Sequence, residues 1–144
     1  MHEWVTEAVQ KGGRLACGGK RLSSPSLYPP TVVVNPPTNC RLSQSEIFGP
    51  VVAVYGYDTL QEAIQRANAV PWGFQASVFS NHMPSVWEAA KRLNATAVMV
   101  NDHTAFRVDW MPFGGRGQSG LGMGGIPYSM HEMTEPKMIV FNNM

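Results

Sequence analysis

Apolar strands alternate with amphipathic helices between Val51 and Val100, and this alternation constrains the fold more than any other feature. Apolar runs at 51–55, 76–79 and 97–100 predict three short strands. Between them, apolar residues recur at helical spacing, at Leu60, Ala63, Ile64 and Ala67 and again at Val86, Ala89, Ala90 and Leu93. The connections are short, so the pattern predicts an α/β fold with a parallel, largely buried βαβαβ core and right-handed crossovers.

The flanking residues predict a helix, two strands and two irregular stretches. Residues 2–11 have helical periodicity, 14–17 form a strand candidate, and 31–34 form a strand between two Pro-Pro pairs. A glycine-rich stretch at 114–125 precedes a short helix near 128–133. The apolar run 137–141 predicts a last strand, which must pair with an earlier edge or with another subunit.

Composition excludes several function classes. A chain of 144 residues fits one domain, and its net charge of +1 offers no basic field for nucleic acid or anionic membranes. No apolar run approaches the roughly 20 residues that span a bilayer. Two cysteines make no disulfide framework, so a reducing cytoplasm is the expected location. Charged residues are only 15%, which suggests that much surface is covered by another chain or by further sequence.

Glu46 and Phe48 stand two residues apart in the run Ser-Glu-Ile-Phe-Gly-Pro at 45–50. In an extended segment such residues project to the same side, so a carboxylate and a flat apolar ring would face one ligand. The pair suits a ribose and the ring attached to it, because the carboxylate accepts hydroxyl hydrogens and the phenyl ring stacks. The local residues alone favour the alternative, an exposed acid beside a core phenylalanine before a turn.

Two overlapping GxGxxG matches begin at Gly115 and Gly120. A dinucleotide site needs a strand before the motif and a helix that opens within it, so that the pyrophosphate meets the helix N-terminus. Pro112 precedes the first match and no helix start lies inside, which favours a structural loop with close backbone approaches. The His131–Glu135 pattern lacks the second histidine of a zinc helix, so no metal site is predicted.

Cys40 and Arg107 have a functional and an ordinary interpretation. Cys40 has a cation beside it in Arg41, as a nucleophilic thiolate needs, but packing is favoured; Cys17 is also expected to pack. Arg107 follows Phe106, and a salt bridge to Asp109 or solvation is favoured for it. The functional alternative is a clamp on an anionic group, because a guanidinium suits carboxylate and phosphate oxygens.

Several of these stretches, in order, resemble segments of the aldehyde dehydrogenase superfamily. They are 46–51, 66–68 with 72–74 and 76–79, 100–101, 112–115, 119–122 and 132–137. The resemblance covers nearly the whole chain and implies part of an NAD(P)-dependent enzyme that oxidises an aldehyde to an acid through a cysteine thiohemiacetal and thioester. It implies that residues 1–136 are the C-terminal part of the catalytic domain and 137–144 an oligomerisation strand.

By position, the resemblance implies that Glu46 binds the nicotinamide ribose of NAD or NADP and that Phe48 packs against the nicotinamide ring. Phe113, with Phe106 or Arg107, would line the aldehyde tunnel, and Arg107 hints at a small anionic aldehyde. The nucleophilic cysteine, the general base, the oxyanion asparagine and the cofactor domain belong to the family's upstream part, so no catalytic residue is expected here. The expected function is an inactive C-terminal fragment of a homo-oligomeric enzyme. The alternative is a non-catalytic module that docks on full-length subunits or on a separately encoded N-terminal part.

Overall fold

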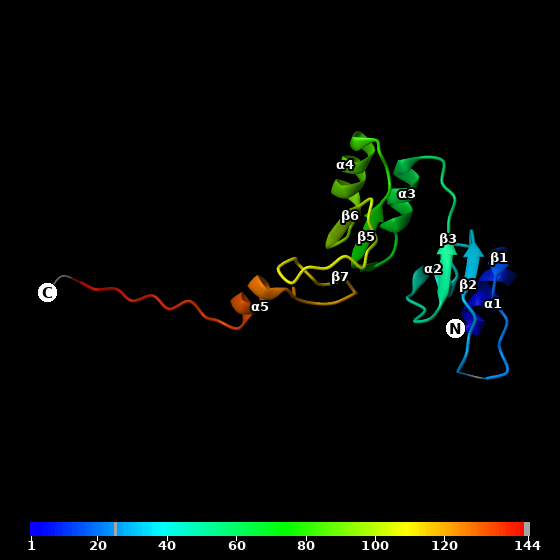
Figure 1. Cartoon of the computed structure of the whole chain (residues 1–144), viewed down its shortest axis with the longest axis horizontal. Coiled ribbons are helices and arrows are strands. Elements are labelled where there is room, and N and C mark those ends of the chain that lie inside the picture. Colours follow the sequence, from blue (N-terminus) through cyan, green and yellow to red (C-terminus); the bar gives the residue numbers. More distant parts are fainter. Residues whose placement is uncertain (25, 143–144) are drawn as a thin grey trace. The chain divides into compact units, whose positions relative to one another are not determined.

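The structure, a computed structural model, describes residues 1–24 and 26–142 and divides into two compact units, Met1–Thr59 and Leu60–Met144 (Figure 1). The boundary falls between the first strand and the first helix of the alternating stretch. Each unit therefore carries its own sheet and its own helices.

The first unit is a three-stranded sheet with helices packed on one face. The strand order is β1 (Arg14–Cys17), β2 (Thr31–Val34), β3 (Val51–Val54). β1 is antiparallel to β2, and β2 is parallel to β3. The core joins residues of α1 (His2–Gln10), the sheet and α2 (Arg41–Gln44), namely Val5, Ala8, Val33, Cys40 and Leu42. Side chains alternate along β3, so Val52 and Val54 are 57% and 44% exposed on the other face.

The second unit contains a parallel strand pair and a small antiparallel pair. β5 (Gln75–Val78) pairs in parallel with β6 (Ala97–Val100) through the crossover helix α4 (Met83–Arg92). β4 (Trp72–Gly73) pairs antiparallel with β7 (Arg116–Gly117). Helix α3 (Leu60–Ala67) precedes these strands and α5 (Ile126–Glu132) follows them.

Asn101 fastens the carboxyl ends of β5 and β6 to each other. Its Oδ1 accepts a hydrogen bond from the Ser80 N–H at 2.8 Å, and its Nδ2 donates to the Ser80 carbonyl at 3.1 Å. Its φ of 55° lies in the left-handed region, which asparagine tolerates better than most residues.

The predicted helices and strands before residue 101 are confirmed, each within about two residues of its expected bounds. One parallel sheet through the three strands of the alternating stretch is wrong, because β3 pairs with β2 and only β5 and β6 share a sheet. Periodicity identifies a strand but not its partner. Here the β-branched run Thr31–Val34 offers β3 a full four-residue ladder.

The structure assigns no strand at 137–141, where a last strand paired with an earlier edge or with another subunit is predicted; pairing with another subunit stays a prediction. A strand needs a ladder partner, and none of the described strands pairs with this segment. Its apolar side chains are exposed: Met138 86%, Ile139 68%, Val140 77% and Phe141 91%. Among the described helices, none has the length and apolar character needed to cross a bilayer.

Candidate functional site

The segment from Ser45 to Pro50 links α2 to β3 and presents Glu46 and Phe48 to solvent. Ile47 between them packs against the buried core of the first unit. Glu46 is exposed and Phe48 is 82% exposed. The sequence alternative that made Phe48 a core residue is therefore wrong, and a carboxylate and an aromatic ring are both open to a ligand.

Phe48 has a backbone conformation that aromatic residues rarely adopt. Its φ is 46°, in the left-handed region, where the Cβ of an L-residue crowds the backbone. Only glycine occupies this region without strain, and the penalty for other residues is about 1–2 kcal/mol. An exposed aromatic side chain on a strained backbone does not stabilise the fold. Residues with such unusual backbone conformations concentrate at functional sites.

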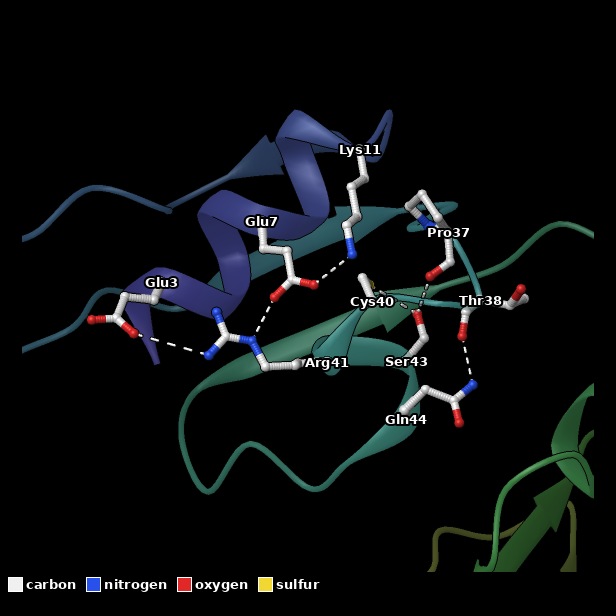
Figure 2. A network of polar contacts seen from close by, with 9 residues as sticks. All are labelled: Glu3, Glu7, Lys11, Pro37, Thr38, Cys40, Arg41, Ser43 and Gln44. Carbon is white, nitrogen blue, oxygen red and sulfur yellow. Dashed lines mark hydrogen bonds and ion pairs between the residues drawn. The ribbon is translucent and has the colours of Figure 1, made fainter.

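A polar network fixes the residues that precede this segment (Figure 2). The Glu7 carboxylate accepts hydrogen bonds from Lys11 Nζ at 2.8 Å and from Arg41 Nε. The hydrogen bond from Lys11 and then that from Arg41 lower the pKa of Glu7 from 4.5 to about 2. Glu7 therefore holds its charge far below neutral pH and pairs α1 with the first residue of α2.

In the second unit, Arg107 and Phe113 lie together. The Arg107 guanidinium carbon is 3.9 Å from the Phe113 ring centroid, within cation–π range. Phe74 meets the same ring edge to face, with the centroids 5.0 Å apart and the planes at 83°. Sequence reasoning did not single out Phe74, because only the fold brings residue 74 beside residue 113. Phe106 is 46% exposed, and its N–H donates to the His103 carbonyl.

The glycine-rich stretch holds Phe113 in place and contains no helix start. Phe113 and Gly124 exchange two backbone hydrogen bonds, of 3.1 and 2.7 Å. Gly117 has a φ of 59°, and a Cβ there would lie 2.4 Å from the Pro71 carbonyl oxygen. α5 begins only at Ile126, after both GxGxxG matches. The stretch is thus a structural loop with close backbone approaches, as favoured from the sequence.

The two cysteines differ in exposure. Cys40 is completely buried in the core of the first unit, with its Sγ 3.3 Å from Ser43 Oγ, so it packs as expected. Cys17 is exposed, and the expectation that it packs is wrong for this chain. β1 is an edge strand with all four residues exposed, which explains the difference. Within the described residues, no three His, Cys, Asp or Glu side chains gather as a metal site.

Comparison with known proteins identifies the family. The sequence model of the aldehyde dehydrogenase family matches residues 1–139. The chain belongs to the aldehyde dehydrogenase family. It is 39% identical over 142 residues to 3-sulfolactaldehyde dehydrogenase of Priestia aryabhattai, an alignment that covers 99% of this chain and 29% of that enzyme.

Solved structures of aldehyde dehydrogenases have the same fold. Aldehyde dehydrogenase 21 of Physcomitrella patens, in complex with its reaction product succinate, matches with a TM-score of 0.87 and 36% identity, over 93% of this chain and 27% of that one. Glyceraldehyde-3-phosphate dehydrogenase of Methanocaldococcus jannaschii, complexed with NADP, matches with a TM-score of 0.83 and 35% identity, over 92% and 28%. The chain thus spans under a third of the length of these relatives.

Proposed function

We propose that this chain contributes the nicotinamide end of the cofactor site and one wall of the aldehyde site to an NAD(P)-dependent aldehyde dehydrogenase. The observation that carries the proposal is the pairing of exposed Glu46 with a strained, 82% exposed Phe48. Ile47 is partly buried against the core while its two neighbours are exposed, which supports a surface shaped for a ligand.

The two side chains have separate roles in this proposal. The Glu46 carboxylate, an acceptor-only group when ionised, takes hydrogen bonds from two ribose hydroxyls. The Phe48 ring packs against the attached heterocycle and excludes water from it. The nicotinamide cofactor, when bound, accepts the hydride that leaves the substrate carbon. Both residues therefore orient the cofactor, and neither attacks the aldehyde.

The 144 residues alone are proposed to be inactive. A thiolate must attack the aldehyde before hydride transfer, and it needs an accessible, electropositive setting. Cys40 is sealed in the core, and exposed Cys17 is near the Pro30 carbonyl, an acceptor that does not stabilise a thiolate. Nucleophile, general base and the adenosine part of the cofactor site would come from the rest of the subunit.

Turnover assays test this division of labour. The purified chain, given NAD⁺ or NADP⁺ and a series of simple aldehydes, is expected to produce no NAD(P)H. In a complete subunit, Glu46→Gln should raise the KM for the cofactor, since an amide accepts fewer hydrogen bonds than a carboxylate. Glu135→Gln, at another exposed glutamate, is the matched control and should leave it unchanged. Turnover by the chain alone, or equal effects of the two variants, would contradict the proposal.

The proposed substrate is a small aldehyde with an anionic group. Arg107 lies over Phe113, the residue assigned to the aldehyde tunnel, and its guanidinium can bind carboxylate, sulfonate or phosphate oxygens. Among the relatives' names and ligands, 3-sulfolactaldehyde, glyceraldehyde 3-phosphate and succinate are anions, whereas lactaldehyde is neutral and betaine aldehyde is cationic. In the complete enzyme, Arg107→Leu should raise the KM for anionic aldehydes and spare neutral ones of equal size. An equal loss for both would refute this role and favour Phe106.

A second function, docking without catalysis, rests on the apolar segment 138–141. Four consecutive exposed apolar residues form an unpaired strand candidate that can add to a sheet edge of a full-length subunit or of another copy. Light scattering of the chain, alone and mixed with a full-length homologue, tests the idea. A strictly monomeric chain in both samples would exclude docking.

The cytoplasmic location stays a prediction.

A further inference from the structure

The helix that leads into the Glu46–Phe48 segment is too short to be stable by itself. α2 has four residues, and its N-cap, Cys40, makes no side-chain cap hydrogen bond. One turn of helix fixes several backbone dihedrals for a single hydrogen bond, so it needs outside support. The position of α2 therefore depends on what its side chains contact.

Every residue of α2 makes a packing contact, a hydrogen bond or an ion pair with residues outside the helix. Leu42 is 8% exposed in the core, and Ser43 Oγ donates to the Pro37 carbonyl at 2.8 Å. Gln44 Nε2 donates to the Thr38 carbonyl at 2.5 Å. These contacts lie within the same stretch of chain as α2 or in the core, whereas Arg41 alone reaches a charged group on another helix, Glu7 of α1 (Figure 2).

The segment after α2 has little support of its own. Ser45 N–H still donates to the Arg41 carbonyl at 3.0 Å, and β3 begins after Pro50. Within the described part of the chain, no hydrogen bond is made by Glu46, Ile47 or Phe48. Their placement is therefore set by α2 on one side, by β3 on the other, by the packing of Ile47 and by the Met1 side chain beside Gly49.

We propose that Glu7 and Arg41 are positioning residues that hold α2 against α1 and thereby set the direction of Glu46 and Phe48. The link to the cofactor rests on the proposed function, but the positioning itself is a property of the ligand-free chain. The pair lies about 34 positions apart in sequence, so it fixes tertiary structure rather than a local turn.

A plain stabilising ion pair is the alternative. The side chains of Arg41 and Glu7 are 49% and 21% exposed, and pairs of this kind contribute little to global stability. Lys11 separates the two explanations, because it binds the other oxygen of the same carboxylate from within α1. Removal of Lys11 changes the charge around Glu7 but leaves the connection between α1 and α2 intact.

Amide NMR and hydrogen exchange on the ligand-free 144-residue chain test the positioning. Glu7→Gln and Arg41→Gln should each shift the amide signals of residues 45–49. They should also speed the exchange of the Ser45 amide, which is hydrogen-bonded to Arg41, by about fivefold, the upper range for an exposed pair. The double variant should change the signals by less than the sum of the two single variants, because both remove the Glu7–Arg41 contact, although Arg41→Gln also removes the contacts of Arg41 with Glu3 and the Trp4 ring. Lys11→Gln should leave these signals in place. Equal shifts in all three variants, or none at 45–49, would overturn the proposal.

Acid titration tests whether the charge of Glu7 affects the signals of residues 45–49, which an ion pair that only stabilises the fold would not do. The charged groups around Glu7 are Glu3 and Lys11 on α1 and Arg41 on α2, with His2 at the start of α1. The 45–49 signals of the unaltered chain should show a transition centred at about pH 2, where Glu7 protonates in the folded chain, and Glu7→Gln should remove that transition. An unchanged titration in Glu7→Gln would contradict the proposal.

A titration with nicotinamide mononucleotide separates this proposal from the proposed function. Weaker binding in Glu7→Gln and Arg41→Gln, with Lys11→Gln unaffected, supports both. If the unaltered chain shows no binding, the cofactor role of Glu46 and Phe48 in the isolated chain is refuted. The NMR shifts still decide whether Glu7 and Arg41 position the segment.

Discussion

The left-handed backbone of Phe48 predicts an inverted order of stability for two substitutions. At ordinary positions alanine is the better replacement, because glycine loses about 0.5–1 kcal/mol more conformational entropy on folding. At φ 46° alanine retains the strain of an L-residue and glycine does not. Phe48→Gly should therefore be more stable than Phe48→Ala, the reverse of the usual order.

The magnitude follows from the exposure of the side chain. Phe48 is 82% exposed, so it buries about 40 Å² of the 150–250 Å² that an aromatic residue can bury. Either substitution loses that contact, worth about 1 kcal/mol. Glycine also relieves about 1–2 kcal/mol of strain, against its entropy penalty of about 0.5–1 kcal/mol. The glycine variant should exceed the alanine variant by about 0.5–1 kcal/mol in free energy of unfolding.

Hydrogen exchange of the β2 amides measures this difference, because β2 is the central strand of the unit that contains Phe48. Phe79 supplies the control: it is 71% exposed, but its φ is not positive, so Phe79→Ala should be more stable than Phe79→Gly. The β5 amides report on that pair. If alanine is as good as glycine at position 48, the strain argument fails, and with it a main support for the cofactor role.

Three further variants probe the fold. The pKa of Glu7 is lowered from 4.5 to about 2 in the folded chain. The ionised carboxylate therefore stabilises the folded chain fully above pH 4.5, and this stabilisation is lost as the pH falls to about 2. In urea unfolding, Glu7→Gln should be less stable than the unaltered chain at about pH 6 and equal to it near pH 2. Val33→Ala, at 0% exposure, should lower the unfolding free energy by about 2 kcal/mol, against under about 0.5 for exposed Val52→Ala. Gly117→Ala should lower the thermal midpoint, through at least about 1 kcal/mol of strain, and an unchanged midpoint would contradict the approach to Pro71.

Local patterns in the sequence were sufficient for most elements of the fold. Apolar periodicity identified α3, α4, β5 and β6, because each buries one face and the pattern follows that face. It did not identify the partner of β3, since the ladder with β2 joins residues about 20 positions apart. Nor did it show that 137–141 pairs with none of the described strands, because a strand's own residues do not specify its partner.

The site was predictable only in part. Glu46 and Phe48 lie in one short run of sequence, so this motif could be identified from the sequence. The strain at Phe48 was not, because nothing in the residue types demands a positive φ there. The contacts of Arg107 and Phe74 with Phe113 arise from the fold of the second unit, so spacing could not reveal them.

The unequal cysteines give the chain an internal reporter. Cys17 is exposed on the edge strand, while Cys40 is completely buried beside Val5 and Val33. A thiol reagent in excess should label one cysteine at once and the second only when the core of the first unit opens. The rate of the second labelling step therefore reports how often the unit that carries Glu46 and Phe48 opens, without any substitution in the chain.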